Sequence, residues 1–156
     1  MVTASNSSLL LVYRTDVCEY HKTMAFHRES VRCLARVNSH QFASGSMDGA
    51  VVVWSADTLS PLKVLHNPDK YRNEHKAYIY SVRQLLPVGD YLAAAIGNGF
   101  QVYDVHAGEV VLNALRRHDA EVNQLLFLYS GTRVLSCAAD GVIRMWATAS
   151  NHSFSR

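Results

Sequence analysis

The amino-acid sequence predicts an all-β fold made of repeats of forty-odd residues, each holding four short strands. Two segments carry this prediction: Phe42 to Trp54, FASGSMDGAVVVW, aligns without a gap on Val134 to Trp146, VLSCAADGVIRMW. Each has two runs of strand length joined by an Asp-Gly turn. Self-similarity at a fixed period indicates a repeat architecture.

Two further copies of this segment are one residue shorter and end in tyrosine. They are Val2 to Tyr13, VTASNSSLLLVY, and Leu92 to Tyr103, LAAAIGNGFQVY. The terminal aromatic residues of the four copies stand at positions 13, 54, 103 and 146, with spacings of 41, 49 and 43 residues. These spacings fit one repeat whose loops vary in length.

The other strands of each repeat lie before and after these copies. Apolar runs of strand length come first, at Ser30–Val37, Tyr80–Leu86 and Glu121–Leu128. A less apolar strand follows each of the first three terminal aromatic residues, at Cys18–Phe26, Pro61–His66 and Glu109–Leu115. Four short antiparallel strands per repeat are typical of a β-propeller blade.

The number of blades predicts an incomplete ring. We expect a partial blade at 1–26, a blade at 27–66, a polar loop at 67–77, a degenerate blade at 78–115, a blade lacking its last strand at 116–147 and a tail at 148–156. Three to four blades are about half of a seven- or eight-bladed propeller. Because uncovered blade faces and strand edges favour aggregation, we expect a fragment of a longer propeller, or a chain that pairs with others.

Composition and charge limit the function classes. The chain has 156 residues, 49% of them apolar, which suits one globular domain. Its formal charge of +2 is far from the concentrated basic surface that nucleic-acid binding favours, so no nucleic-acid partner is expected. Three cysteines without CxxC spacing predict neither a disulfide framework nor a metal site, and fit the cytosol or nucleus. The apolar run Leu9–Tyr13 is too short for a signal peptide or a bilayer span, so membrane contact is expected only through partners.

Two of the copies carry the same four polar and aromatic residues. A histidine lies 21 or 22 residues before an aspartate, a serine lies four before that aspartate, and a tryptophan lies six after it. The sets are His27, Ser44, Asp48 and Trp54, and His118, Ser136, Asp140 and Trp146. This pattern resembles the WD40 repeat. The resemblance implies a structural tetrad in which Trp bonds to Ser, Ser to His and His to Asp, so that each buried polar group satisfies the next.

The same residue types admit a catalytic alternative. A serine hydrolase could use Ser44 or Ser136 as nucleophile, with His27 or His118 as base. The occurrence of the set at two matching positions and the absence of a Gly-x-Ser-x-Gly elbow favour the structural interpretation. We therefore expect a protein that is not an enzyme and holds no cofactor.

The Leu92 to Tyr103 copy departs from the pattern. It has Ala94 where the others have serine, Asn98 where they have aspartate and Tyr103 where they have tryptophan. Its candidate histidine, His75, is displaced along the chain. We expect this blade to depend mainly on strand pairing and apolar packing, and to be the more mobile one.

The WD40 resemblance also implies where partners bind, because such propellers bind proteins through the loops around their central channel. The candidate partner-binding residues are Arg28, Glu29, Met47, Lys70, Arg72, Lys76, Asn98, Asp119 and Glu121. The alternative for the polar segment at 67–77 is an ordinary solvated loop.

The order of the four copies is similar to the C-terminal half of the WD repeat-containing protein 41 family. That resemblance implies a non-catalytic scaffold, partnered by the DENN-domain subunits of a complex that regulates small GTPases, linked to autophagy. It also implies a cytoplasmic protein recruited to the lysosome surface. A generic WD40 adaptor, such as a ubiquitin-ligase substrate receptor, is the alternative within the same class.

Overall fold

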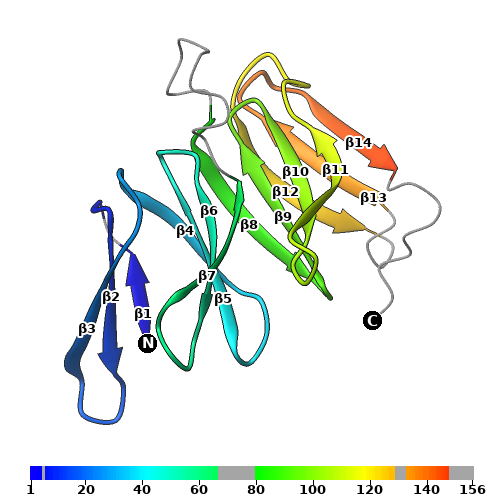
Figure 1. Cartoon of the computed structure of the whole chain (residues 1–156). Helices are drawn as coiled ribbons and strands as arrows, with labels where there is room; N and C mark the ends of the chain where they lie inside the picture. The colour runs from blue at the N-terminus through cyan, green and yellow to red at the C-terminus, as the bar shows by residue number, and fades with distance from the viewer. Residues whose placement is uncertain (5, 67–79, 129–132, 148–156) are drawn as a thin grey trace.

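A computed structural model describes residues 1–4, 6–66, 80–128 and 133–147, which form fourteen strands in four antiparallel sheets (Figure 1). Sheet A contains β1 (Val2–Ala4), β2 (Leu9–Arg14) and β3 (Glu19–Ala25). Sheet B contains β4 (Val31–Arg36), β5 (Gln41–Ser46), β6 (Val51–Ser55) and β7 (Pro61–His66). Sheet C contains β8 (Val82–Val88), β9 (Tyr91–Ile96), β10 (Gly99–Asp104) and β11 (Glu109–Ala114). Sheet D contains β12 (Val122–Leu128), β13 (Arg133–Ala138) and β14 (Ile143–Ala147).

The repeated segments form the same hairpin in sheets B, C and D. Their terminal aromatic residues occupy one register position: Trp54 pairs with Phe42, Tyr103 with Leu92 and Trp146 with Val134. The Asp-Gly turns end in Gly49 and Gly141, which have positive φ angles of 86° and 77°. Glycine adopts such angles without the steric strain that a side chain would cause. The gapless alignment of the sequences therefore corresponds to a common strand register.

Burial follows the composition of the strands. Every residue of β6, Val-Val-Val-Trp-Ser, is buried, as is nearly every residue of β9 and β10. Continuous apolar runs are expected in strands that are covered on both faces. The outer strands β3, β7 and β11 are mostly exposed or half-buried.

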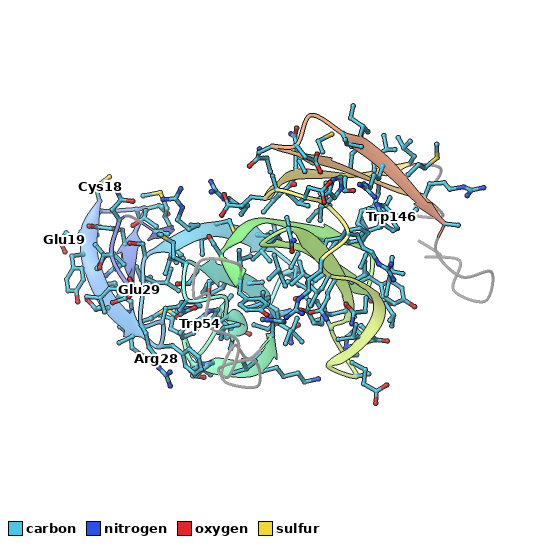
Figure 2. All side chains as sticks on the ribbon, turned by 90° about the horizontal axis from the view of Figure 1, so that it is seen from above. Cys18, Glu19, Arg28, Glu29, Trp54 and Trp146 are labelled. Atoms are coloured by element: carbon cyan, nitrogen blue, oxygen red, sulfur yellow. The ribbon has the colours of Figure 1, made fainter. Side chains whose placement is uncertain are left out.

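The four sheets follow one another in chain order along an arc (Figures 1 and 2). The first strands of sheets B, C and D lie beside one another, so that β4 contacts β8 and β8 contacts β12, and β1 of sheet A contacts β4. Blades of a propeller are related in this way, around a shared inner side. The predicted fold class, an all-β partial propeller, is confirmed.

Three hydrophobic clusters fill the spaces between successive sheets. The cluster between sheets A and B includes Leu10, Met24, Val52 and Trp54. The cluster between sheets B and C includes Val51, Val53, Leu65, Val82, Leu92 and Tyr103. The cluster between sheets C and D includes Phe100, Val102, Leu125 and Val134. Each sheet between two others therefore buries both of its faces. Removal of apolar surface from water, worth about 25 cal/mol per Å², is the main contribution to the stability of this stacking.

Gly45 on β5 lies against Val82 of β8, where sheet B meets sheet C. A Cβ atom at this position would lie 2.4 Å from Val82 Cγ1 and 2.8 Å from Cys33 Sγ, so a larger residue cannot fit without displacing β8. Loss of solvent around the Cys33 thiol raises its pKa to about 12. Cys33 is therefore a neutral, packed thiol at physiological pH.

The expected polar loop at 67–77 and tail at 148–156 lie outside the described residues, and the blade boundaries remain predictions. Each predicted strand run contains a strand, although β8 begins two residues later than the expected Tyr80. The described residues contain no helix whose length and apolarity would allow it to cross a membrane.

We predict that Cys33 resists thiol labelling in the folded protein, because the thiolate is the reactive species and burial suppresses it. In a Cys18→Ser/Cys137→Ala variant at pH 8, Ellman's reagent should label Cys33 only after urea is added. A Cys33→Ser/Cys137→Ala variant is the matched control, since Cys18 is exposed and should react at once. Equal labelling rates without urea would contradict the close contact of β5 with β8.

Candidate functional site

The first set of four residues joins sheet A to sheet B. His27 follows the end of β3, whereas Ser44 lies on β5 and Trp54 on β6. His27 Nε2 is 2.7 Å from Ser44 Oγ, to which Trp54 Nε1–H donates a hydrogen bond of 2.8 Å. On its other side, His27 Nδ1 lies 3.5 Å from Oδ2 of Asp48 in the β5–β6 turn. We call this set the A–B bridge.

The second set repeats this geometry between sheets C and D. His118 Nε2 is 2.7 Å from Ser136 Oγ, and Trp146 Nε1–H donates to the same oxygen at 2.8 Å. His118 Nδ1 is 3.0 Å from Oδ2 of Asp140, whose Oδ1 accepts the Val142 N–H at 2.9 Å. The hydrogen bond from the Val142 amide contributes most to holding the pKa of Asp140 below its ordinary value. We call this set the C–D bridge.

The donors and acceptors of both bridges have one consistent order. The tryptophan indole can only donate, so the serine oxygen accepts from it and donates its own hydrogen to histidine Nε2. The remaining proton of a neutral imidazole then sits on Nδ1, facing the aspartate. Ser44, Ser136 and both histidines are buried. In Figure 2, Trp54 lies among the side chains between the sheets, whereas Arg28 points away from them.

Asp48 is held by backbone amides as well as by His27. Its Oδ2 accepts the Arg28 N–H at 2.8 Å and its Oδ1 accepts the Ala50 N–H at 2.8 Å. Burial alone would raise the pKa of Asp48, but the nearby His27 imidazole and the hydrogen bonds from the two amides outweigh it, and the pKa lies below the ordinary value of 3.8. Asp48 therefore remains a carboxylate at neutral pH and ties the β5–β6 turn to the segment after β3.

The Ser-His-Asp order resembles that of a hydrolase, but the surroundings do not suit catalysis. Ser44 and Ser136 have no exposed surface. In each set the tryptophan N–H occupies a lone pair of the serine oxygen. A nucleophile must meet its substrate beside an oxyanion site, and a fully covered hydroxyl cannot do so.

Sheets B and C are joined by a third polar set, which the sequence analysis did not single out. His66, at the end of β7, places Nδ1 2.9 Å from Oε1 of Gln101 on β10. The Tyr103 hydroxyl donates to the same oxygen at 2.6 Å. All three side chains are buried. We call this set the B–C bridge; the displaced candidate histidine, His75, lies outside the described residues.

The B–C bridge explains how the degenerate copy accommodates the loss of serine. Ala94, at the serine position, pairs across the ladder with Gln101, so the acceptor has moved to the neighbouring strand. The sequence did contain a signal for this bridge. Gln101 is a polar residue inside the apolar run of β10, and it lies two residues before Tyr103 and therefore on the same face. The expectation that this blade depends mainly on strand pairing and apolar packing therefore omitted a buried polar contact.

The candidate partner-binding loops lie at one edge of the sheets. Arg28 and Glu29 lie between β3 and β4, Met47 between β5 and β6, and Asn98 between β9 and β10. Backbone hydrogen bonds link these turns to their neighbours: Met47 N–H donates to Ser30 at 2.9 Å. The residues therefore share one surface.

The same edge continues over sheets C and D. The His118 N–H donates to the Asn98 carbonyl at 2.9 Å, and the Asp119 N–H donates to Asp140 at 3.1 Å. Glu121 is engaged by Arg83 in an ion pair. Lys70, Arg72 and Lys76 lie outside the described residues. Within the described part of the chain, no three His, Cys, Asp or Glu side chains gather as metal ligands would.

Blade-like sheets joined by buried histidine bridges define a β-propeller repeat protein. The sequence profile of the WD40 family, described as "WD domain, G-beta repeat", matches residues 18–55 and 109–147. These ranges contain all eight residues of the A–B and C–D bridges. The chain belongs to the WD40-repeat family.

Two groups of relatives resemble the chain over most of its length. The U3 small nucleolar RNA-associated protein 15 homologs of Gallus gallus and Bos taurus are each 32% identical, over 90% and 82% of this chain. WD repeat-containing protein 41 of Mus musculus is 25% identical over 84% of it. The chain spans only 25%, 24% and 30% of these three relatives. These names describe WD-repeat and small nucleolar RNA-associated proteins rather than enzymes.

Solved structures agree on the fold. The computationally designed Ika4 protein superposes with a TM-score of 0.75 at 22% identity, covering 95% of this chain and 84% of the designed one. The designed Ika8 protein gives 0.73 at 23% identity, covering 94% of this chain and 42% of its own. At such identity the likeness concerns the fold alone.

The expected location is wrong. A cytoplasmic protein recruited to the lysosome surface followed from the resemblance to the WD repeat-containing protein 41 family. The U3 small nucleolar RNA-associated relatives are more similar, at 32% against 25% identity, and point to the nucleolus. The prediction was based on the order of the four copies, which does not determine where a WD40 protein acts in the cell.

We predict that Gln101→Ala destabilises the fold by roughly 1 to 3 kcal/mol, because the buried Tyr103 hydroxyl and His66 Nδ1 would lose their acceptor. Urea unfolding followed by tryptophan fluorescence measures this change. Gln124→Ala, at an exposed position of β12, is the matched control and should change stability little. Equal effects of the two substitutions would show that the B–C bridge contributes nothing specific.

We predict an acid-sensitive contribution from Asp48. Its folded-state pKa is depressed, so its stabilisation is complete above the ordinary value of 3.8 and is lost as the pH falls through the lower folded-state pKa. Asp48→Asn should therefore lower the free energy of unfolding at pH 7 and lessen its fall on acidification. Urea titrations over this pH range measure both effects, with Asp57→Asn, an exposed carboxylate, as control. An unchanged pH dependence in Asp48→Asn would contradict the role of this carboxylate.

Proposed function

We propose that the chain is a non-catalytic scaffold that binds other proteins through the loop edge defined by Arg28, Glu29, Met47, Asn98 and Asp119. The observation that carries this proposal is the burial of the serines and histidines of the A–B and C–D bridges, the residues that a serine hydrolase would need at its surface. The hydroxyls and imidazoles of the bridges are used inside the fold. The loops are the polar groups left for partners, and WD40 repeats serve as interaction scaffolds.

We infer that the assembly is one associated with the U3 small nucleolar RNA. The support is 32% identity with U3 small nucleolar RNA-associated protein 15 homologs over most of this chain. A net charge of +2 provides little phosphate-binding surface. The chain would therefore join such an assembly by binding its protein components rather than by binding the RNA directly.

A second candidate assembly is a DENN-domain complex that regulates small GTPases, with its link to autophagy. It is favoured by the similarity to WD repeat-containing protein 41 over 84% of this chain. Both candidates require the same protein-binding edge, so they differ in partner and not in mechanism. A generic adaptor, such as a ubiquitin-ligase substrate receptor, would use that edge as well.

Affinity purification of the tagged chain from cell extract tests the proposal. We expect protein components of the U3 assembly by mass spectrometry and the U3 RNA by hybridisation, with the protein components retained after the RNA is digested by ribonuclease. DENN-domain subunits or ubiquitin-ligase subunits would instead assign the chain to one of the other two assemblies. Recovery of purified RNA alone, without protein, would contradict a protein-binding scaffold.

Charge-reversing variants locate the binding edge. Glu29→Lys and Asp119→Lys change exposed residues of the loop edge and should reduce partner recovery several-fold. Asp57→Lys and Asp90→Lys are the matched controls, because these exposed carboxylates lie in turns at the opposite edge. Loss of partners from the controls alone would place the interface at the opposite edge and contradict the assignment.

A further inference from the structure

The two ends of the row of sheets carry apolar side chains that no neighbouring sheet covers in the described part of the chain. On sheet D, Leu126, Leu135 and Met145 form one cross-strand row, with Ile143 on the same face. This is the face opposite to the one that packs on sheet C, because side chains alternate along a strand. We call it the tail face.

The tail face is apolar at positions that are buried in every other sheet. Met145 directly precedes the terminal aromatic residue of its copy, as do the buried Val12, Val53 and Val102. Met145 itself is 61% exposed. These equivalent positions are covered by the following sheet, so the tail face has the composition of a junction without its partner.

Ile143 shows the same contrast at the second position. It stands three residues before the terminal aromatic residue, where the other copies have Leu10, Val51 and Phe100, all fully buried. Ile143 is 67% exposed. Repeat proteins whose end faces remain in water present polar side chains there.

Sheet A presents the complementary half of such a junction. Tyr13 and Leu11 occupy the positions of Trp54 and Val52, which the preceding sheet covers in the A–B junction. Tyr13 packs edge-on against the exposed Tyr20 at a ring-centroid distance of 6.2 Å, and Leu9 lies on the same face. We call this surface the head face. In Figure 1 the head and tail faces stand at opposite ends of the row.

We propose that the tail face of one copy of this chain packs on the head face of a second copy, and that two copies close a ring. Every junction inside the chain joins the tail side of one sheet to the head side of the next, so this contact continues the same packing. The interface is head-to-tail, and such interfaces give either closed rings or open filaments. Two copies supply eight sheets, and about eight blades is the upper end of the range in which propellers close.

Sedimentation velocity of the full 156-residue chain tests the proposal. We expect a species of twice the 17.4 kDa chain mass. Met145→Lys on the tail face and Leu11→Lys on the head face should each give a monomer. Circular dichroism should show that both variants keep the strand content of the unchanged chain. Leu62→Lys and Val110→Lys are matched controls, because these exposed apolar residues lie on the outer strands β7 and β11, and they should leave the dimer intact.

A mixture of the two end-face variants distinguishes this arrangement from others. A pair made of one copy of each variant has one junction between two unchanged faces and one junction that carries both substitutions. The mixture should therefore form dimers that neither variant forms alone. A dimer that survives Leu11→Lys but not Met145→Lys would indicate contact between two tail faces and overturn the proposal. A monomeric unchanged chain, or species that grow without limit as concentration rises, would overturn it as well.

Discussion

Each junction between successive sheets depends on one buried imidazole. His27, His66 and His118 follow or end the outer strand of one sheet and place a ring nitrogen within hydrogen-bond distance of an oxygen on the next. Apolar packing brings the sheets together but is not directional, so it leaves their relative position weakly specified. A hydrogen bond tolerates only a narrow range of distance and angle. The imidazole therefore fixes how one sheet sits on its neighbour.

The three junctions reach this result with two chemistries. In the A–B and C–D bridges the acceptor of the tryptophan N–H is a serine on the second strand of the sheet, and an aspartate in the next turn completes the set. In the B–C bridge Gln101, on the third strand, accepts from both Tyr103 and His66. An amide oxygen has two lone pairs, which allows both bonds. Because these groups are enclosed, the loop edge provides the polar surface for partners, which is the basis of the proposed scaffold function.

The strands and the A–B and C–D bridges could be predicted from the sequence because their residues recur at nearly constant spacing along the chain. The spacing from His27 to Trp54 recurs from His118 to Trp146 with one residue of difference, and the hairpins share one register. The B–C bridge was missed because His66 and Gln101 have no counterparts at equivalent positions in the other copies. Their contact depends on how sheet C packs on sheet B, which no spacing along the chain reveals. The cellular setting was mispredicted for a related reason, since the order of blades reports the fold and not the partner.

The tautomeric states of the three bridging histidines test the central claim most directly. Long-range ¹⁵N–¹H correlation spectra of the folded chain distinguish a proton on Nδ1 from one on Nε2. We expect His27, His66 and His118 each to carry the proton on Nδ1, facing Asp48, Gln101 and Asp140, while the exposed His21 shows the averaged signals of a solvated ring. Averaged signals from the three bridging rings, or a proton on Nε2, would contradict an account in which fixed imidazoles hold the sheets together.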